Sequence, residues 1–214
     1  TITDDDATPS LSIDDVTVNE AAGTMTFTVT LSAASGQAVS VNYATGDVSA
    51  TAGADYTAGS GTLSFAPGVV SQTVTVTIAE DTIFEGNETL NVTLSAATNA
   101  TIADTLGVGT IADNDLAPTL AVSSPTVGEA GGFAVFTLSL SNPSATATSF
   151  TLTLTNGSAT AADYGPALEV STDGGTTWVS ASSATIAAGA TSVQVRTPVI
   201  NDALDENSET FSLT

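Results

Sequence analysis

Short segments in which apolar residues alternate with threonine are the feature that most restricts how this chain can fold. They include residues 25–31 (MTFTVTL), 74–78 (VTVTI) and 150–154 (FTLTL). A period of two places successive side chains on opposite faces of a β-strand, so each segment predicts a strand with a buried apolar face and a wet threonine face. Clusters of Gly, Pro, Asn and Asp between these segments predict turns. The pattern therefore predicts an all-β chain built from antiparallel β-sandwiches.

The sequence also repeats itself. Residues 18–23 (VNEAAG) return as residues 127–132 (VGEAGG), so Glu20 corresponds to Glu129 at an offset of 109 residues. Between Glu88 and Glu209 the offset has grown to 121, which places an insertion of roughly a dozen residues in the second copy. Insertions of this kind are tolerated in surface loops. The repeat predicts two tandem modules.

Matching sequences mark the module boundaries. Residues 1–9 (TITDDDATP) resemble residues 110–118 (TIADNDLAP) at the same offset of 109. We therefore expect residues 1–7 to be the tail of a preceding module, 8–116 to be the first module and 117–214 to be the second. Nothing in the second copy corresponds to residues 107–111 (GVGTI), so we expect that module to be incomplete before its last strand and to expose an unpaired strand edge.

The insertion in the second copy contains residues 171–178 (STDGGTTW). This stretch resembles the S-x-D-x-G-x-T-W pattern of the Asp-box, a β-hairpin in which the Asp caps the turn and the Trp packs against it. The resemblance implies a structural role for Asp173 and Trp178. The alternative is that Trp178 stacks on a sugar ring, as in a carbohydrate-binding accessory module.

Charge and composition exclude several classes of function. The chain has 23 acidic residues against one basic residue, Arg196, for a net charge of -22, which disfavours nucleic acid and anionic lipid as partners. No apolar run approaches the roughly 20 residues that cross a bilayer. Without Cys or His there is no thiol nucleophile, Ser-His-Asp triad or usual zinc ligand set, and we expect no enzyme activity. The composition is typical of bacterial exported proteins, so we expect an extracellular or cell-surface location.

Two acidic strings share one spacing. Residues 81–88 (DTIFEGNE) and 202–209 (DALDENSE) both follow D-x-x-x-E-x-x-E. Carboxylates this close repel one another unless a cation lies among them. Calcium is the expected cofactor, because it is a hard cation that accepts six to eight oxygen ligands in flexible geometry. A solvated acidic face that only aids solubility is the alternative.

Together these motifs resemble the Calx-beta family, known from sodium/calcium exchangers and from large bacterial surface adhesins. The resemblance is carried by residues 18–20 (VNE), 41–43 (VNY), 51–56 (TAGADY), 81–88 (DTIFEGNE) and 111–115 (IADND). It implies two tandem immunoglobulin-like antiparallel β-sandwiches of Calx-beta type, the second truncated before its last strand. It also implies calcium bound in the loops at one end of each sandwich.

The same resemblance implies a set of metal ligands. In the first module they are Glu20, Asp47, Glu80, Asp81, the Ile83 carbonyl, Glu85, Glu88, Asp113 and Asp115. In the second module they are Glu129, Asp202, the Leu204 carbonyl, Glu206 and Glu209. Asn156 stands where the first module has Asp47, and the terminal acidic pair has no counterpart, so we expect the second site to be weaker or empty.

The expected function is that of a calcium-binding structural repeat of an extended bacterial surface or secreted protein, such as an adhesin. Calcium would order the end loops and stiffen the joints with neighbouring Calx-beta modules. Other regions of such a protein would contact host or surface glycans or proteins. One alternative is a calcium-sensing regulatory module of a larger transporter or enzyme. The other is the carbohydrate-binding module described above.

Overall fold

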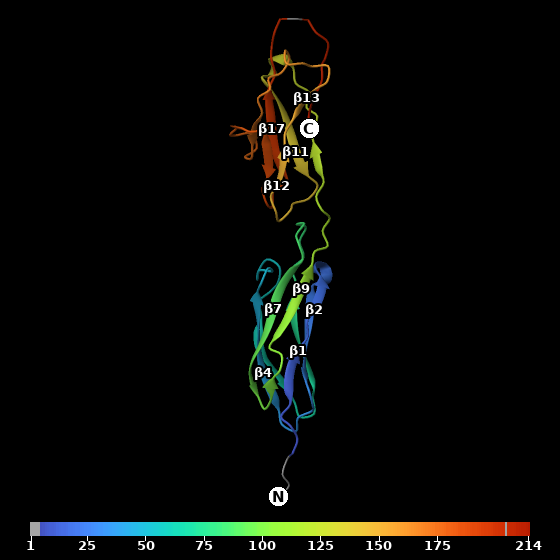
Figure 1. Cartoon of the computed structure of the whole chain (residues 1–214), viewed down its shortest axis with the longest axis vertical. Helices are drawn as coiled ribbons and strands as arrows, with labels where there is room; N and C mark the ends of the chain where they lie inside the picture. The colour runs from blue at the N-terminus through green and yellow to red at the C-terminus, as the bar shows by residue number, and fades with distance from the viewer. Residues whose placement is uncertain (1–4, 204) are drawn as a thin grey trace. The chain divides into compact units, whose positions relative to one another are not determined.

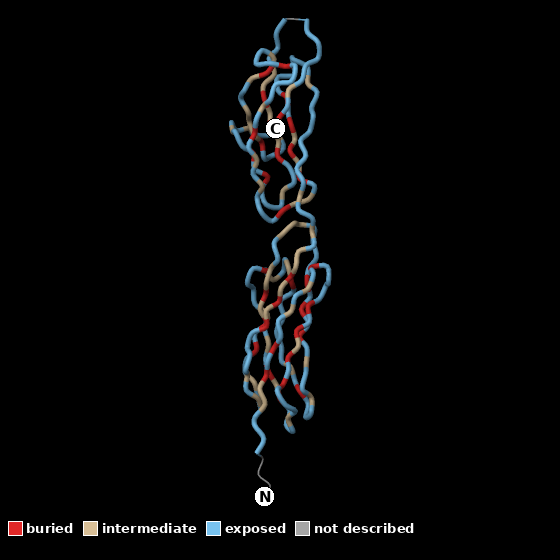
Figure 2. Tube along the Cα trace, turned by 45° about the vertical axis from the view of Figure 1, so that its right-hand side comes forward, coloured by how far each residue is buried: buried red, intermediate tan, exposed pale blue. Residues whose placement is uncertain are grey.

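The computed structural model describes residues 5–203 and 205–214, which form two compact all-β units (Figure 1). The first unit takes in residues 1–81 and 86–114, and the second takes in residues 82–85 and 115–214. Each unit has its own hydrophobic core, visible as buried segments within its strands (Figure 2). The predicted pair of tandem immunoglobulin-like sandwiches is confirmed.

Two sheets make up the first unit. One has the order β6 (Ser71–Thr77), β3 (Thr24–Leu31), β1 (Ser10–Ile13) and β8 (Thr101–Ile102). The other has the order β2 (Val16–Asn19), β9 (Leu106–Ala112), β7 (Glu88–Thr98), β4 (Val39–Asp47) and β5 (Ser60–Phe65). The β1–β8 and β2–β9 pairs are parallel, and the other pairs are antiparallel.

The alternation seen in the sequence explains how this unit closes. In β3, Met25, Phe27 and Val29 are buried, while the threonines between them lie on the outer face. Strand β6 follows the same pattern against β3, with register partners from Thr24–Thr77 to Thr30–Ser71. Burying one apolar face per strand is the main favourable term in such a fold.

The second unit has one large sheet and two strand pairs. The large sheet has the order β10 (Leu120–Val122), β11 (Phe133–Leu140), β17 (Ser192–Pro198), β14 (Glu169–Ser171) and β15 (Val179–Ser180). The pairs are β12 (Thr148–Thr151) with β16 (Ser183–Ile186), and β13 (Leu154–Asn156) with β18 (Phe211–Leu213). The two helical turns, η1 (Glu20–Ala22) and η2 (Glu129–Gly131), are three residues each, and no helix in the described chain could span a membrane.

The predicted strand at residues 150–154 is interrupted. It divides into the end of β12 and the start of β13 because the backbone changes partner between them. Leu152 N–H donates to Ser182 O at 3.0 Å, whereas Thr153 N–H donates to Thr214 O at 2.7 Å. The apolar alternation is continuous there, but the pairing is not.

The predicted Asp-box hairpin is present between β14 and β15. Asp173 accepts hydrogen bonds from the Thr177 hydroxyl at 2.6 Å and from the Ser171 hydroxyl at 2.8 Å. The Thr177 hydroxyl and backbone bonds, followed by Ser171, lower the pKa of Asp173 to about 2. The Trp178 indole N–H donates to Gly175 O at 3.0 Å, so the ring closes the turn.

Arg196 packs beside this hairpin. Its guanidinium carbon lies 4.3 Å from the Trp178 ring centroid and 3.9 Å from that of Phe133. Its Nε forms an ion pair with Glu169 at 2.6 Å. Cation–π contact and ion pairing together hold the side chain in place. One face of the Trp178 ring is therefore covered by the guanidinium group, and the sugar-stacking alternative stays a prediction.

Candidate metal centres

Strand pairing brings the first acidic residues together. Strands β2 and β9 run parallel, and Asn19 at the end of β2 lies opposite Ala112 at the end of β9. The residues that follow, Glu20 and Asp113, therefore emerge at the same end of the sheet. Glu20 opens the turn η1, in which Asn19 accepts a hydrogen bond from Ala21 N–H at 3.0 Å and Gly23 adopts a left-handed φ of 70°. Glycine suits this conformation because it has no Cβ to clash.

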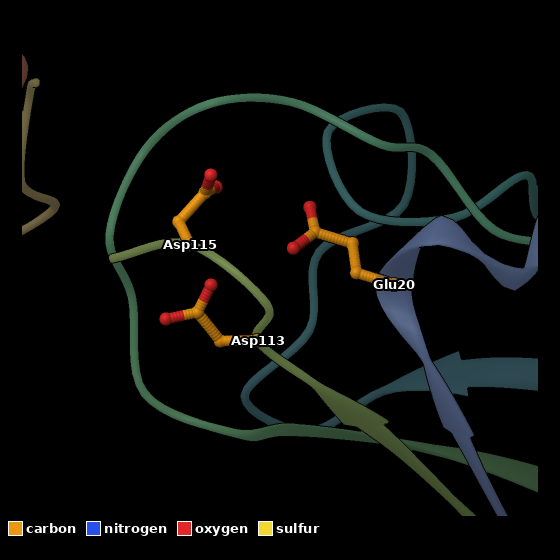
Figure 3. Close-up of side chains that lie close together, drawn as sticks. All are labelled: Glu20, Asp113 and Asp115. Carbon is orange, nitrogen blue, oxygen red and sulfur yellow. The ribbon is translucent and has the colours of Figure 1, made fainter. Parts of the chain in front are cut away.

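The first cluster consists of Glu20, Asp113 and Asp115. Each offers one carboxylate oxygen, and these oxygens lie within 4.8 Å of one another. Figure 3 shows Glu20 entering from η1, with the two Asp side chains on the segment that follows β9. Oxygens that coordinate one calcium ion at about 2.3–2.6 Å can be up to about 5 Å apart. The spacing therefore fits a single ion shared by the three carboxylates.

Glu20 is buried, with 7% of its surface exposed. Its Oε1 accepts a hydrogen bond from Asp81 N–H at 3.3 Å. Burial, together with the charges of Asp81, Glu80 and Asp113, raises the pKa of Glu20 to about 7, although the Asp81 hydrogen bond acts in the opposite direction. A bound cation would reverse this effect by favouring the ionised carboxylate.

The second cluster consists of Asp55, Glu85 and Glu88. Their carboxylate oxygens also meet within 4.8 Å, and all three residues are half-buried. Asp55 accepts a hydrogen bond from Thr51 N–H at 2.6 Å, which fixes the turn that carries it. Glu88 begins β7, so its position is set by the sheet. The D-x-x-x-E-x-x-E string thus supplies two of the three carboxylates.

The third cluster lies in the second unit and consists of Asp163, Glu206 and Glu209, again with oxygens within 4.8 Å of one another. Burial, and after it the charge of Asp163, raises the pKa of Glu206. Glu209 behaves in the same way, with a hydrogen bond to Asp163 as a further cause. The charge of Glu129 contributes to both shifts, so it lies close enough to take part in the same electrostatic field.

Asp47 accepts hydrogen bonds within a turn, and its predicted role as a metal ligand stays a prediction. Its Oδ1 accepts hydrogen bonds from the Tyr56 hydroxyl at 2.6 Å and from Ala52 N–H at 3.0 Å, and it belongs to none of the three clusters. In the second unit, Asn156 accepts the corresponding bond from the Tyr164 hydroxyl. The two positions share a scaffold contact that needs an acceptor oxygen and no charge.

The other predicted ligands lie around these clusters. Glu80 accepts a hydrogen bond from the Asn114 side chain at 3.0 Å, and the charge of Asp202 acts on Glu206. Ile83 lies on the segment between Asp81 and Glu85, half-buried. Leu204 lies outside the described residues, so the prediction for its carbonyl stays a prediction.

Sequence reasoning missed Asp55 and Asp163 as members of the clusters, because each reads as a turn-capping residue. Both do cap turns, since Asp163 accepts a hydrogen bond from Thr160 N–H at 2.7 Å, as Asp55 does from Thr51. The available signal was their recurrence in both copies as A-D-Y at residues 54–56 and 162–164.

The sequence supplies almost no cationic side chain to balance these carboxylates. Its sole Lys or Arg is Arg196, which is engaged by Glu169 and two aromatic rings in the second unit. The donor sets contain only oxygen, which suits a hard divalent cation and not a thiolate- or imidazole-preferring metal. The residues present therefore fit a bound metal ion.

The chain is similar to one known domain family and to several solved structures. The Calx-beta domain model matches residues 3–116 and again residues 113–214. A crystal structure of the apo-form Calx CBD1 domain is 26% identical with a TM-score of 0.49, covering 51% of this chain and 100% of its own. A structure of CBD12 from CALX1.2 is 21% identical with a TM-score of 0.49, and the match covers 95% of this chain and 78% of that one. A structure of calcium binding domain CBD12 of CALX1.1 is 20% identical with a TM-score of 0.48, and the match covers 90% of this chain and 76% of that one. No curated protein matches the chain. Because the two family-model matches together span nearly the whole sequence, this chain belongs to the Calx-beta domain family and carries two copies of the domain in tandem.

Proposed function

We propose that this chain is a calcium-binding structural repeat of an extended bacterial surface or secreted protein. Calcium holds the acidic end loops in one conformation and stiffens the joints with neighbouring modules. The carrying observation is that three clusters of three carboxylates form in a chain whose single Arg is engaged elsewhere. Such clusters are stable in a folded protein when a cation lies among them.

The choice of calcium follows from the ligands. Magnesium demands a compact octahedral shell and keeps several of its waters, whereas calcium accepts six to eight oxygens from carboxylates and backbone carbonyls. The first cluster is surrounded by further oxygen donors, including Glu80 and Asp81. A loop-borne, carboxylate-rich set of this kind suits the larger ion. The calcium-binding domain CBD12 of CALX1.1 supports this choice by family likeness alone.

The surface location and the adhesin role rest on composition. A net charge of -22, with Arg196 as the single basic residue, keeps an extended array soluble and disfavours non-specific association. It also makes the acidic loops dependent on divalent ions from outside the protein. Extracellular fluids supply such ions at concentrations that suit weak sites. Surface labelling of intact cells with an antibody to this chain tests the location, and labelling only after lysis would contradict it.

Chelation tests the calcium proposal. A ligand present at about 100 times its dissociation constant stabilises the folded state by roughly 2.7 kcal/mol per site. The melting temperature should therefore fall on addition of EGTA and recover when calcium is restored in excess. A melting temperature that chelator and calcium leave unchanged would overturn the proposal.

Variants separate the clusters. In isothermal titration calorimetry, Asp113→Asn should remove or weaken binding at the first cluster, and Glu88→Gln should do so at the second. Asp104→Asn is the matched control, because Asp104 lies in the same unit, caps Leu106 N–H at 3.2 Å and belongs to no cluster. Equal calcium binding in all three variants and the unmodified protein would show that the carboxylate clusters are not the sites.

A further inference from the structure

The second unit contains a cavity of about 730 Å³ beside β13, and all of its lining residues lie between residues 152 and 182. Leu152 and Tyr164 line it and are buried, and Leu154 and Leu168 line it and are half-buried. The inner walls are therefore mostly apolar. Pockets of roughly 300–1,000 Å³ with such walls are the usual size for small organic ligands.

The cavity opens where two strands separate. Leu152 N–H donates to Ser182 O at 3.0 Å, which continues the pairing of β12 with β16. The preceding residue on that side, Ala181, instead donates its N–H to Leu168 O at 3.1 Å. In the first unit the equivalent strands, β4 and β5, stay paired beyond this point. The insertion that carries the Asp-box hairpin therefore divides the two strands and leaves the cavity between them.

In the first unit an aromatic ring occupies the equivalent place. Tyr43 lies opposite Gly61 in the register of β4 and β5. A Cβ added at Gly61 would be 3.0 Å from Tyr43 Cε1 and 3.1 Å from its hydroxyl oxygen, so the phenol ring lies directly on the glycine. The offsets of 109 and 121 that relate the two copies take Tyr43 to Leu152 and Gly61 to Ser182. Both counterparts line the cavity.

The exchange of Tyr for Leu at this position removes the ring that fills the space in the first copy. Protein interiors are normally packed to high density, and a wall without neighbouring atoms loses its dispersion contacts. An apolar cavity of this kind can take up an aromatic molecule that restores those contacts. The comparison of the two copies therefore indicates the shape of the missing group, which is a single aromatic ring.

The lining also indicates the charge of the ligand. Among the described residues, no charged side chain lines the cavity, although the chain contains 23 acidic residues. An ionised ligand would lose its water there without gaining a partner. The polar lining groups include the Asn156 amide and the hydroxyls of Ser180 and Ser182. These groups can form hydrogen bonds with a hydroxyl group of a ligand.

We propose that this cavity binds a small uncharged aromatic compound of the phenol class. The ring lies against Leu152, in the place equivalent to that of the Tyr43 ring, and its hydroxyl bonds to the polar groups of the lining. The inference does not depend on calcium, because the ligand contacts no carboxylate of the described lining.

A nuclear magnetic resonance titration of the whole protein with p-cresol, which is the tyrosine side chain as a free molecule, tests the inference. Amide signals of residues 152–154 and 180–182 should shift and saturate. Those of Tyr43 and Gly61 should not, because the first unit already fills the equivalent place. 4-Methylbenzoate, which has a similar shape but is ionised at neutral pH, should bind at least about tenfold more weakly. No saturable shift, or equal binding of 4-methylbenzoate, would overturn the inference.

Two variants that fill the cavity locate the site. Leu152→Tyr restores the residue of the first unit and should weaken p-cresol binding at least about tenfold. A substitution at a buried position can disturb packing, so Ala167→Phe, which adds a ring at an exposed lining position, should give the same loss. Thr155→Tyr is the matched control, because Thr155 is exposed on β13 and does not line the cavity. Unchanged affinity in Ala167→Phe and in folded Leu152→Tyr would overturn the inference.

A second probe identifies the source of the ring. N-acetyltyrosinamide carries the same phenol on a peptide backbone. It should bind more weakly than p-cresol, because the cavity is proposed to hold a free compound. Tighter binding of N-acetyltyrosinamide would overturn the assignment, since the occupant would then be a tyrosine side chain of another polypeptide.

Discussion

Metal-free protein should lose stability as the pH rises from 5 to 8, and Glu20 should be the main cause. Its carboxyl group titrates near 4.5 when exposed and at about 7 in the folded chain. A group whose folded pKa is raised favours the folded state below its unfolded value, and this contribution is lost as the pH rises through the folded value. The destabilising window therefore runs from about 4.5 to about 7.

The size of the effect follows from the two pKa values. At about 1.4 kcal/mol for each pH unit, the difference corresponds to about 3 kcal/mol of unfolding free energy in the first unit at pH 8. Glu20 is 7% exposed, but its neighbours Ala21, Glu80 and Asp81 are exposed, so solvent screening makes this value an upper limit. For a domain of about 100 residues, it corresponds to a fall in melting temperature on the order of 15 °C. Excess calcium should abolish the fall, because the ion keeps the carboxylate ionised at every pH in the window.

Thermal denaturation in EGTA at pH 5, 6, 7 and 8 measures the slope, and Glu20→Gln removes the titrating group. The first unit of the variant should be nearly independent of pH across this range and more stable than that of the unmodified protein at pH 8 without calcium. Asp104→Asn should keep the original slope. Equal stability of the unmodified protein at pH 5 and pH 8, or the same slope in Glu20→Gln, would refute the reasoning.

Three further outcomes are expected. Asp173→Ala should loosen the Asp-box hairpin above pH 4 and have little effect below pH 2. The pKa of Asp173 is lowered to about 2, so its stabilising charge is lost as the pH falls through that value. Near-ultraviolet circular dichroism of Trp178 measures the loosening. Tyr56→Phe removes the hydroxyl that donates to Asp47 Oδ1, although Ala52 N–H still donates to the same oxygen, and should cost about 1–3 kcal/mol in urea denaturation. A value near zero would contradict the assigned contact. Gly109→Val should destabilise the first unit by about 1–3 kcal/mol through overpacking, whereas Gly59→Val, which meets nothing within 4 Å, should not.

Much of the fold could be predicted from the alternation of apolar residues and threonine. The prediction succeeds where a strand keeps the same neighbours along its length, as β3 does against β6. It fails at residues 152–153, where the side-chain pattern continues while the backbone passes from one partner to another. Strand pairing depends on residues far away in the sequence, and a local period carries no information about them.

The acidic motifs of the metal centres could be predicted from the sequence, but the full set of residues that meet in each cluster could not. The two D-x-x-x-E-x-x-E strings each contribute two carboxylates to a cluster. Which Asp completes the set depends on the turn that ends in Tyr56. That turn directs Asp55 toward Glu85 and Glu88 and leaves Asp47 to accept the Tyr56 hydroxyl. From the sequence alone, Asp47 and Asp55 are equally suitable as the third carboxylate of the cluster. The conformation of the turn distinguishes them.

Arg196 has a practical consequence for handling this protein. Trypsin cleaves after Lys or Arg, so the whole sequence offers it a single cleavage point, and that point lies within β17, between β11 and β14. A protease needs its substrate strand detached and extended in its own cleft, so cutting requires the sheet to open first. The rate at which trypsin cuts the intact chain into two fragments therefore reports how often the sheet of the second sandwich opens, and the experiment needs no label or engineered site.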